Sequence, residues 1–209
     1  MDFAAARTMM VDSQVRVNDV TDRALQAAMR AVPRERFCAP DRAFSAYAEV
    51  ECEIADGRVL MLPREAAKLL SAVEARPGDT ALAIGAPYAG AVLARLGAKV
   101  TAQEANQAVL DVVAPALADA GVETVVAPFD QPHGEGYDII ISEGAVGVRP
   151  QAWLDALAVG GRLAVVERTG AAGRGVLYLR GPDGFSRRDL FDAAPPMLAG
   201  MAPEPVFSF

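Results

Sequence analysis

Three sets of residues in the middle of the chain have the types and spacing of a nucleotide-like binding site. The first is the turn 85–90, with the sequence Gly-Ala-Pro-Tyr-Ala-Gly, which follows a short apolar run. Glycines at such a turn let the backbone approach a ligand closely, and the following helix offers free N–H groups. Glu104 comes about 20 residues later, the distance at which an acid can accept hydrogen bonds from ribose hydroxyls. Asp130 lies farther along, where a carboxylate can reach a base or an amino group.

Each of these residues also has an ordinary structural explanation. Gly85 could simply close a tight turn, Glu104 could favour the positive end of a helix dipole, and Asp130 could be a loop residue. Pro87 has no N–H and Tyr88 is bulky, so both oppose a close approach of ligand to backbone. In their order along the chain, the three sets nevertheless favour nucleotide-type binding. The candidate cofactor residues are Gly85, Ala86, Glu104 and Asp130.

The elements that must position these residues alternate between strand and helix from residue 80 onward. Apolar runs predict six strands, and segments of helical composition lie between most of them. This alternation is typical of an α/β fold, a mostly parallel sheet with helices on both faces. In such a sheet the ligand lies at the carboxyl ends of the strands. The predicted strands are 81–84, 99–102, 124–127, 138–141, 162–167 and 176–180, and the predicted helices are 89–96, 107–120 and 151–157.

The first third of the chain has a different texture. Helical spacing of apolar residues predicts a helix over 20–32, ended by Pro33, and another from Pro63 to about residue 77. The segment 37–62 looks irregular, with a turn at Asp56-Gly57. We expect one domain over 1–209, in which an N-terminal helical extension (1–78) precedes the α/β core (79–209).

Composition excludes several classes of function. The net charge is −7, and no cluster of Lys and Arg resembles a nucleic-acid-binding face. Two cysteines are too few for a disulfide framework, and their spacing predicts no metal site. No apolar run approaches the ~20 residues of a membrane span, and the first residues do not resemble a signal peptide, so we expect a cytoplasmic protein. His133, the only histidine, is expected to be a loop residue.

Several strings of residues carry a family resemblance. The N-terminal third and two later strings resemble the protein-L-isoaspartate O-methyltransferases. The resemblance implies a Rossmann-like S-adenosylmethionine-dependent methyltransferase fold and methyl transfer from that cofactor to isoaspartyl carboxylates of damaged proteins. Protein would then be the substrate or partner. The matching residues are Met10-Val11, Gln14, Asp22, Leu25, Met29, Val32–Phe37, Ala46-Tyr47, Tyr137–Ile140 and Gly160–Leu163.

This sequence departs from the family pattern at the residues that do the chemistry. The family string GQTISQP corresponds to 57–63, where the Thr and Ser positions are Val59 and Met61. The family's EIGTGSGY keeps only its first glycine, Gly85. No catalytic residue is therefore predicted. Arg58 could bind a substrate carboxylate with its guanidinium, or it could be a surface arginine on a turn.

These departures leave the enzymatic status open. The main hypothesis is a family member with weak or lost activity, a pseudoenzyme that serves as a binding or scaffolding protein and could be a homodimer. The alternative is an active methyltransferase on isoaspartyl proteins or a different acceptor. A weaker third hypothesis, a dinucleotide-binding protein, suffers from the proline at the middle position of 85–90.

Overall fold

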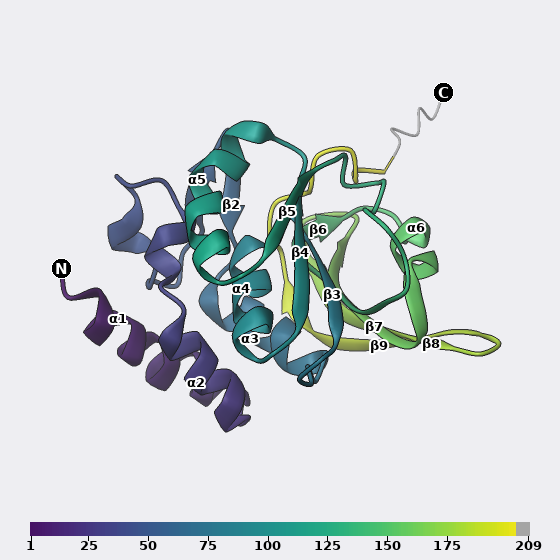
Figure 1. Ribbon diagram of the computed structural model, residues 1–209, viewed down its shortest axis with the longest axis horizontal. Helices are drawn as coiled ribbons and strands as arrows, with labels where there is room; N and C mark the ends of the chain where they lie inside the picture. The colour runs from purple at the N-terminus through teal and green to yellow at the C-terminus, as the bar shows by residue number, and fades with distance from the viewer. Residues whose placement is uncertain (204–209) are drawn as a thin grey trace.

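The apolar runs of the second half form the centre of the molecule, a seven-stranded sheet. The computed structural model, which describes residues 1–203, orders its strands β5-β4-β3-β6-β7-β8-β9 (Figure 1). The pairs among β3 to β7 are parallel, while β8 and β9 join as antiparallel neighbours. The strands are β3 (Thr80–Ile84), β4 (Lys99–Glu104), β5 (Glu123–Val126), β6 (Tyr137–Val146), β7 (Leu157–Arg168), β8 (Gly173–Gly181) and β9 (Gly184–Ala193).

The predicted mostly parallel sheet is confirmed. Five of the six predicted strands lie within observed ones, and the predicted strand 124–127 extends one residue beyond the end of β5. The ninth strand, β9, is missing from the prediction because its sequence, GFSRRDLFDA, is largely charged and exposed. An edge strand buries little of either face, so it carries no apolar run to identify it.

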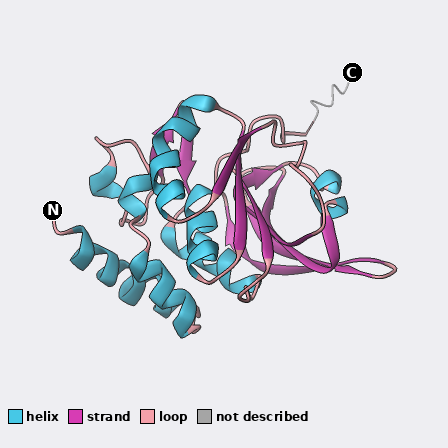
Figure 2. Cartoon of the chain, in the orientation of Figure 1, coloured by secondary structure: helices cyan, strands magenta, loops and turns pink. Residues whose placement is uncertain are grey.

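Neighbouring residues of the central strands face opposite sides of the sheet, as the pleat requires. In β3, Ala81 and Ala83 pack into the larger apolar cluster, while Leu82 and Ile84 pack into a second one. The larger cluster contains residues of α3 (Pro63–Ala72), α4 (Pro87–Arg95) and α5 (Gln107–Asp119). The second cluster contains Trp153 of the short helix α6 (Gln151–Asp155). Helices therefore lie on both faces, with most of the helical mass on one side (Figure 2).

The N-terminal extension contains more regular structure than its sequence predicts. α1 (Phe3–Met10) is not predicted, whereas α2 (Arg23–Ala31) is, and it begins after Asp22, whose side chain accepts the N–H groups of Ala24 and Leu25. The segment that looked irregular contains a hairpin of β1 (Cys52–Ala55) and β2 (Arg58–Leu60), turning at the predicted Asp56-Gly57. No helix between residues 1 and 203 is long and apolar enough to cross a membrane.

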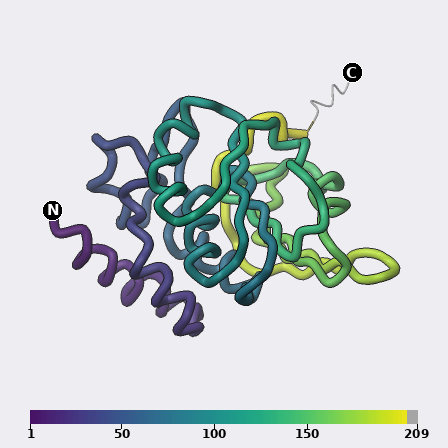
Figure 3. Tube along the Cα trace, viewed as in Figure 1, coloured from purple at the N-terminus to yellow at the C-terminus, as the bar shows by residue number. Residues whose placement is uncertain are grey.

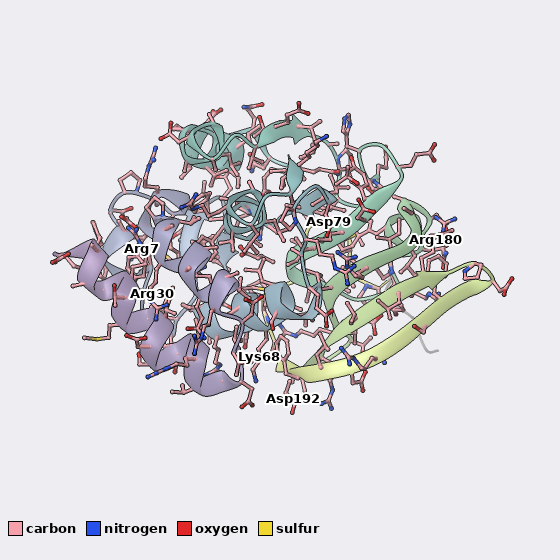
Figure 4. The ribbon with its side chains drawn as sticks, turned by 60° about the horizontal axis from the view of Figure 1, so that its bottom comes forward. Arg7, Arg30, Lys68, Asp79, Arg180 and Asp192 are labelled. Carbon is pink, nitrogen blue, oxygen red and sulfur yellow. The ribbon has the colours of Figure 1, made fainter. Side chains whose placement is uncertain are left out.

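Hydrogen bonds and an ion pair of two arginines tie the extension together. Arg7 on α1 donates to Tyr47, to the carbonyl of Arg30 and to Glu35. Arg30 on α2, which is labelled with Arg7 in Figure 4, pairs with Asp12 at 2.7 Å. On the far side of the extension, Lys68 of α3 lies over the ring of Phe191 in β9, 5.4 Å from its centre.

Arg34 joins the extension to the elements of the site. Its side chain is fully buried and donates to the carbonyls of Ala46 and Met61, the latter just after β2. Its guanidinium also lies 4.6 Å from the centre of the Tyr88 ring, at the start of α4. One cation thus satisfies two buried carbonyls and packs on an aromatic face.

Replacing Arg34 by Met should lower stability substantially, because two buried carbonyls lose their donor. We expect a loss of roughly 2–4 kcal/mol in the free energy of unfolding and a fall in melting temperature of about 5–10 °C. Urea and thermal unfolding followed by circular dichroism measure both. Arg23→Met, at an exposed position of α2, is the control and should melt like the wild type. Equal stability of Arg34→Met would mean that apolar packing replaces this buried cation without cost.

Candidate functional site

A cleft of about 510 Å³ opens at the carboxyl ends of β3 and β4, where ligands of parallel sheets bind. The strand β4 ends at Glu104, and Asn106 caps the following helix α5 by accepting the N–H of Ala108. The hairpin β1–β2 forms the opposite wall. The cleft is lined by Asp56, Gly57, Arg58, Glu104, Ala105, Asn106, Gln107, Phe129, Met197 and Ala199.

Arg58 bridges the two strand ends across this cleft. Its Nη2 donates to the carbonyl oxygen of Gly85 at 2.6 Å and to Oε1 of Glu104 at 3.3 Å. Its guanidinium carbon lies 5.7 Å from the centre of the Phe129 ring. The side chain of Arg58 is 13% exposed and that of Glu104 is 1% exposed, so the pair lies inside the protein rather than on a surface turn.

Burial raises the pKa of Glu104, and the charge and hydrogen bond of Arg58 oppose that rise. The pairing is incomplete. Within residues 1–203, Arg58 Nε and Glu104 Oε2 are buried without a hydrogen-bond partner. A buried acceptor and a buried donor that lack partners each cost free energy, so this bridge is not a fully satisfied one.

The turn after β3 is covered by the side chains of Leu198, Arg58 and Phe129. Gly85 has φ +57°, and a β-carbon built on it would lie 3.0 Å from Leu198 Cδ2, 3.2 Å from Arg58 Nη2 and 3.3 Å from Phe129 Cε1. A β-carbon on Gly144 would come within 2.6 Å of Leu198 Cδ2. The C-terminal segment that carries Leu198 runs back across the ends of the central strands (Figure 3).

An internal carboxylate occupies the start of α4. Pro87 provides no N–H there, and the N–H of Ala89 donates to Oε1 of Glu143 at 3.1 Å. Glu143 is almost completely buried, which raises its pKa to about 7, against the opposing charges of Arg34 and Arg58. Sequence reasoning missed Glu143, although a carboxylate two residues after the apolar run 139–141 was a usable signal.

Tyr88 points away from the cleft. It is fully buried, and its ring makes an edge contact with Phe37, at 5.8 Å between ring centres, in the N-terminal extension. The bulk that the sequence placed in the turn therefore fills the core beneath α4. Leu198, Phe129 and Arg58 cover the turn instead, and the first two carried no signal in the sequence.

The other predicted site residues are placed as follows. Ala86 is buried and precedes α4, while Asp130 and His133 are exposed and are not part of the cleft lining. Met61 is fully buried and Val59 is half-buried, both without hydroxyls.

Cys38 and Cys52 are both buried and free. The described part of the chain has no group of three or more His, Cys, Asp or Glu side chains placed to hold a metal ion.

Comparison with known proteins identifies a matching family. Residues 6–172 match the family model described as protein-L-isoaspartate(D-aspartate) O-methyltransferase. The chain is 36% identical to a protein-L-isoaspartate O-methyltransferase of Methylorubrum extorquens over 90% of this chain and 86% of that one. It is 34% identical to one of Methylorubrum populi, over 88% and 91% respectively.

Solved structures agree on the fold. A protein-L-isoaspartate O-methyltransferase superposes with a TM-score of 0.78 at 18% identity, over 95% of this chain and 66% of that one. A Plasmodium falciparum structure described as a beta-aspartate methyltransferase, in complex with S-adenosyl-L-homocysteine, also has a TM-score of 0.78, at 15% identity over 92% and 97%. The predicted Rossmann-like methyltransferase fold is confirmed.

The ionisation of the buried Glu143 should make the stability of the protein depend on pH. Its raised pKa means that its contribution to stability is complete below the unfolded value of ~4.3 and is lost as pH rises through about 7. Glu143→Gln keeps an acceptor for Ala89 and removes the ionisation. The variant should match the wild type at pH 4 and exceed it at pH 8, by at most about 4 kcal/mol. Urea unfolding at several pH values tests this, with the exposed Glu135→Gln as control, and parallel wild-type and Glu143→Gln profiles would refute it.

Proposed function

The chain belongs to the protein-L-isoaspartate(D-aspartate) O-methyltransferase family, and from that premise we propose that its own methyl transfer to isoaspartyl carboxylates is weak or lost. The observation that carries this proposal is the covered turn after β3. The carbonyl of Gly85 and the carboxylate of Glu104 already hold Arg58, and Leu198 lies over the turn.

Family membership indicates S-adenosylmethionine as the cofactor. The residues at the turn do not fit that group in the arrangement described above. A cofactor at this turn needs space against the glycine, a free acid for its ribose and free N–H groups at the helix start. The space is filled, the acid is paired with Arg58, and Glu143 accepts the N–H of Ala89. Binding therefore requires these side chains to move.

The residues at the substrate-binding positions also support weak or lost methyl transfer. A methyl transfer depends mainly on holding the acceptor carboxylate in line with the methyl group, with little acid–base chemistry. The two positions that carry hydroxyls in the resembling family are Val59 and Met61 here, and Met61 is fully buried. Arg58 does not replace them as a carboxylate anchor, because its Nη2 is held by Gly85 and Glu104.

A binding or scaffolding role for a protein partner, including a second copy of the chain, is the function we propose in place of full catalysis, in the cytoplasm. The alternative is methyl transfer to another acceptor, favoured by the retained Glu104 and by the cleft that remains beside it. The family match supports both over dinucleotide binding.

Methyl transfer to an isoaspartyl peptide from labelled S-adenosylmethionine tests the proposal. We expect a rate at least on the order of 100-fold below that of the Methylorubrum extorquens relative, because losing one donor to a transition state already costs about 10²–10³ in rate. Comparable rates for the two proteins would sink the proposal. The same peptide with ordinary aspartate is the control for transfer to other carboxylates.

A further inference from the structure

We infer that Arg58 is a displaceable gate of the cofactor cleft, and that the cleft admits an adenosyl ligand only when the β1–β2 hairpin carries this arginine away. The inference rests on the proposed function, since it explains why the ancestral site is closed. It adds that, among the contacts that close the site, the pairing of Arg58 with Glu104 is the one whose release admits the ligand.

The hydrogen-bonding groups of Arg58 are complementary to the acceptors that remain. A guanidinium offers only donors, and the strand ends offer a carbonyl at Gly85 and a carboxylate at Glu104. The hydroxyls of a ribose would donate to the same carboxylate. Arg58 and such a ligand therefore compete for Glu104.

The closed state is held imperfectly. Among the residues that the structure describes, Arg58 Nε and Glu104 Oε2 have no hydrogen-bond partner, although both are buried. A ligand that supplied two donors to Glu104 would satisfy the oxygen that Arg58 leaves unpaired. Displacement would then exchange one incomplete pairing for a more complete one, with Arg58 released toward water.

Arg58 belongs to a small structural unit, the β1–β2 hairpin. The strands β1 and β2 form their own two-stranded sheet, separate from the seven-stranded one. Arg58 is the first residue after the exposed Asp56-Gly57 turn. Besides Arg58 itself, the turn is tied to the cleft's other wall by a hydrogen bond from Asn106 Nδ2 to Asp56 Oδ2, at 2.8 Å and exposed to solvent. Few polar contacts therefore hold the turn down.

Leu198 and Phe129 are the rival cover, because both also lie against Gly85. They differ from Arg58 in chemistry, since neither side chain has a donor that could bind the carboxylate of Glu104. The experiment must therefore separate the loss of the cation from the loss of apolar cover.

Arg58→Gln is the first variant, since glutamine stands at this position in the family string GQTISQP. S-adenosylhomocysteine at millimolar concentration is the probe, followed by thermal unfolding and calorimetric titration. We expect no shift in the wild type and a rise in melting temperature of roughly 3–6 °C in Arg58→Gln, as for a ligand at ten times its dissociation constant. Arg64→Gln removes the same charge from an arginine that is 40% exposed, and should behave like the wild type.

Asn106→Asp provides a second test if Arg58→Gln fails to fold. Aspartate keeps the helix cap but repels Asp56, so the hairpin should open more readily and the probe should bind more tightly than to the wild type. Gln107→Glu adds the same charge at the next cleft residue without touching the hairpin, and should not tighten binding. The emission of Trp153 should shift with binding, because its indole N–H donates to the carbonyl of Phe129 at 2.6 Å.

Three outcomes would overturn the gate. One is a wild type that binds the probe as tightly as Arg58→Gln. Another is a folded Arg58→Gln that does not bind. The third is binding that appears only after Leu198→Ala, with or without Arg58. None of these decides the proposed function, which depends on methyl transfer by the wild type and is lost only if that transfer is robust.

Discussion

A buried cation facing two strand ends is the interaction on which the site depends. Parallel strands that end side by side bring carbonyls and carboxylates together, and in this protein those groups lie beneath apolar side chains. Buried acceptors need donors, and Arg58 supplies them to Gly85 and Glu104. At the start of α4 the roles are exchanged, because there a buried N–H, that of Ala89, needs an acceptor and Glu143 supplies it. The protein thus supplies partners of its own to polar groups at the ends of these strands, although Glu104 Oε2 and Arg58 Nε stay unpaired among the residues that the structure describes.

The fold was predictable because its signals are local. Apolar runs bounded by Gly, Pro and Asp mark the strands β3 to β8, and Asp22 and Pro63 mark helix starts. The first turn of the site and Glu104 also follow from position, since each comes directly after a strand. Local signals miss α1, the short strands β1 and β2, and the largely charged strand β9.

The cover of the site could not be predicted from the sequence for a different reason. Leu198 and Phe129 are ordinary apolar residues, and only the folded chain brings them over Gly85. The direction of Tyr88 is likewise set by a remote partner, because Arg34 and Phe37 receive its ring. The sequence identified the positions that depart from the family pattern, but it could not show which side chains lie over the turn after β3.

The position of Leu198 after the strands that it covers has a consequence for biosynthesis. The hydrogen bond from its N–H to the carbonyl of Ala145 holds this covering side chain over β6, and it forms only after residue 198 has been synthesised. During translation the strands β3, β4 and β6 precede it, so a nascent chain presents these strand ends without their apolar cover. Synthesis of the segment around Leu198 is therefore the step that closes this part of the molecule.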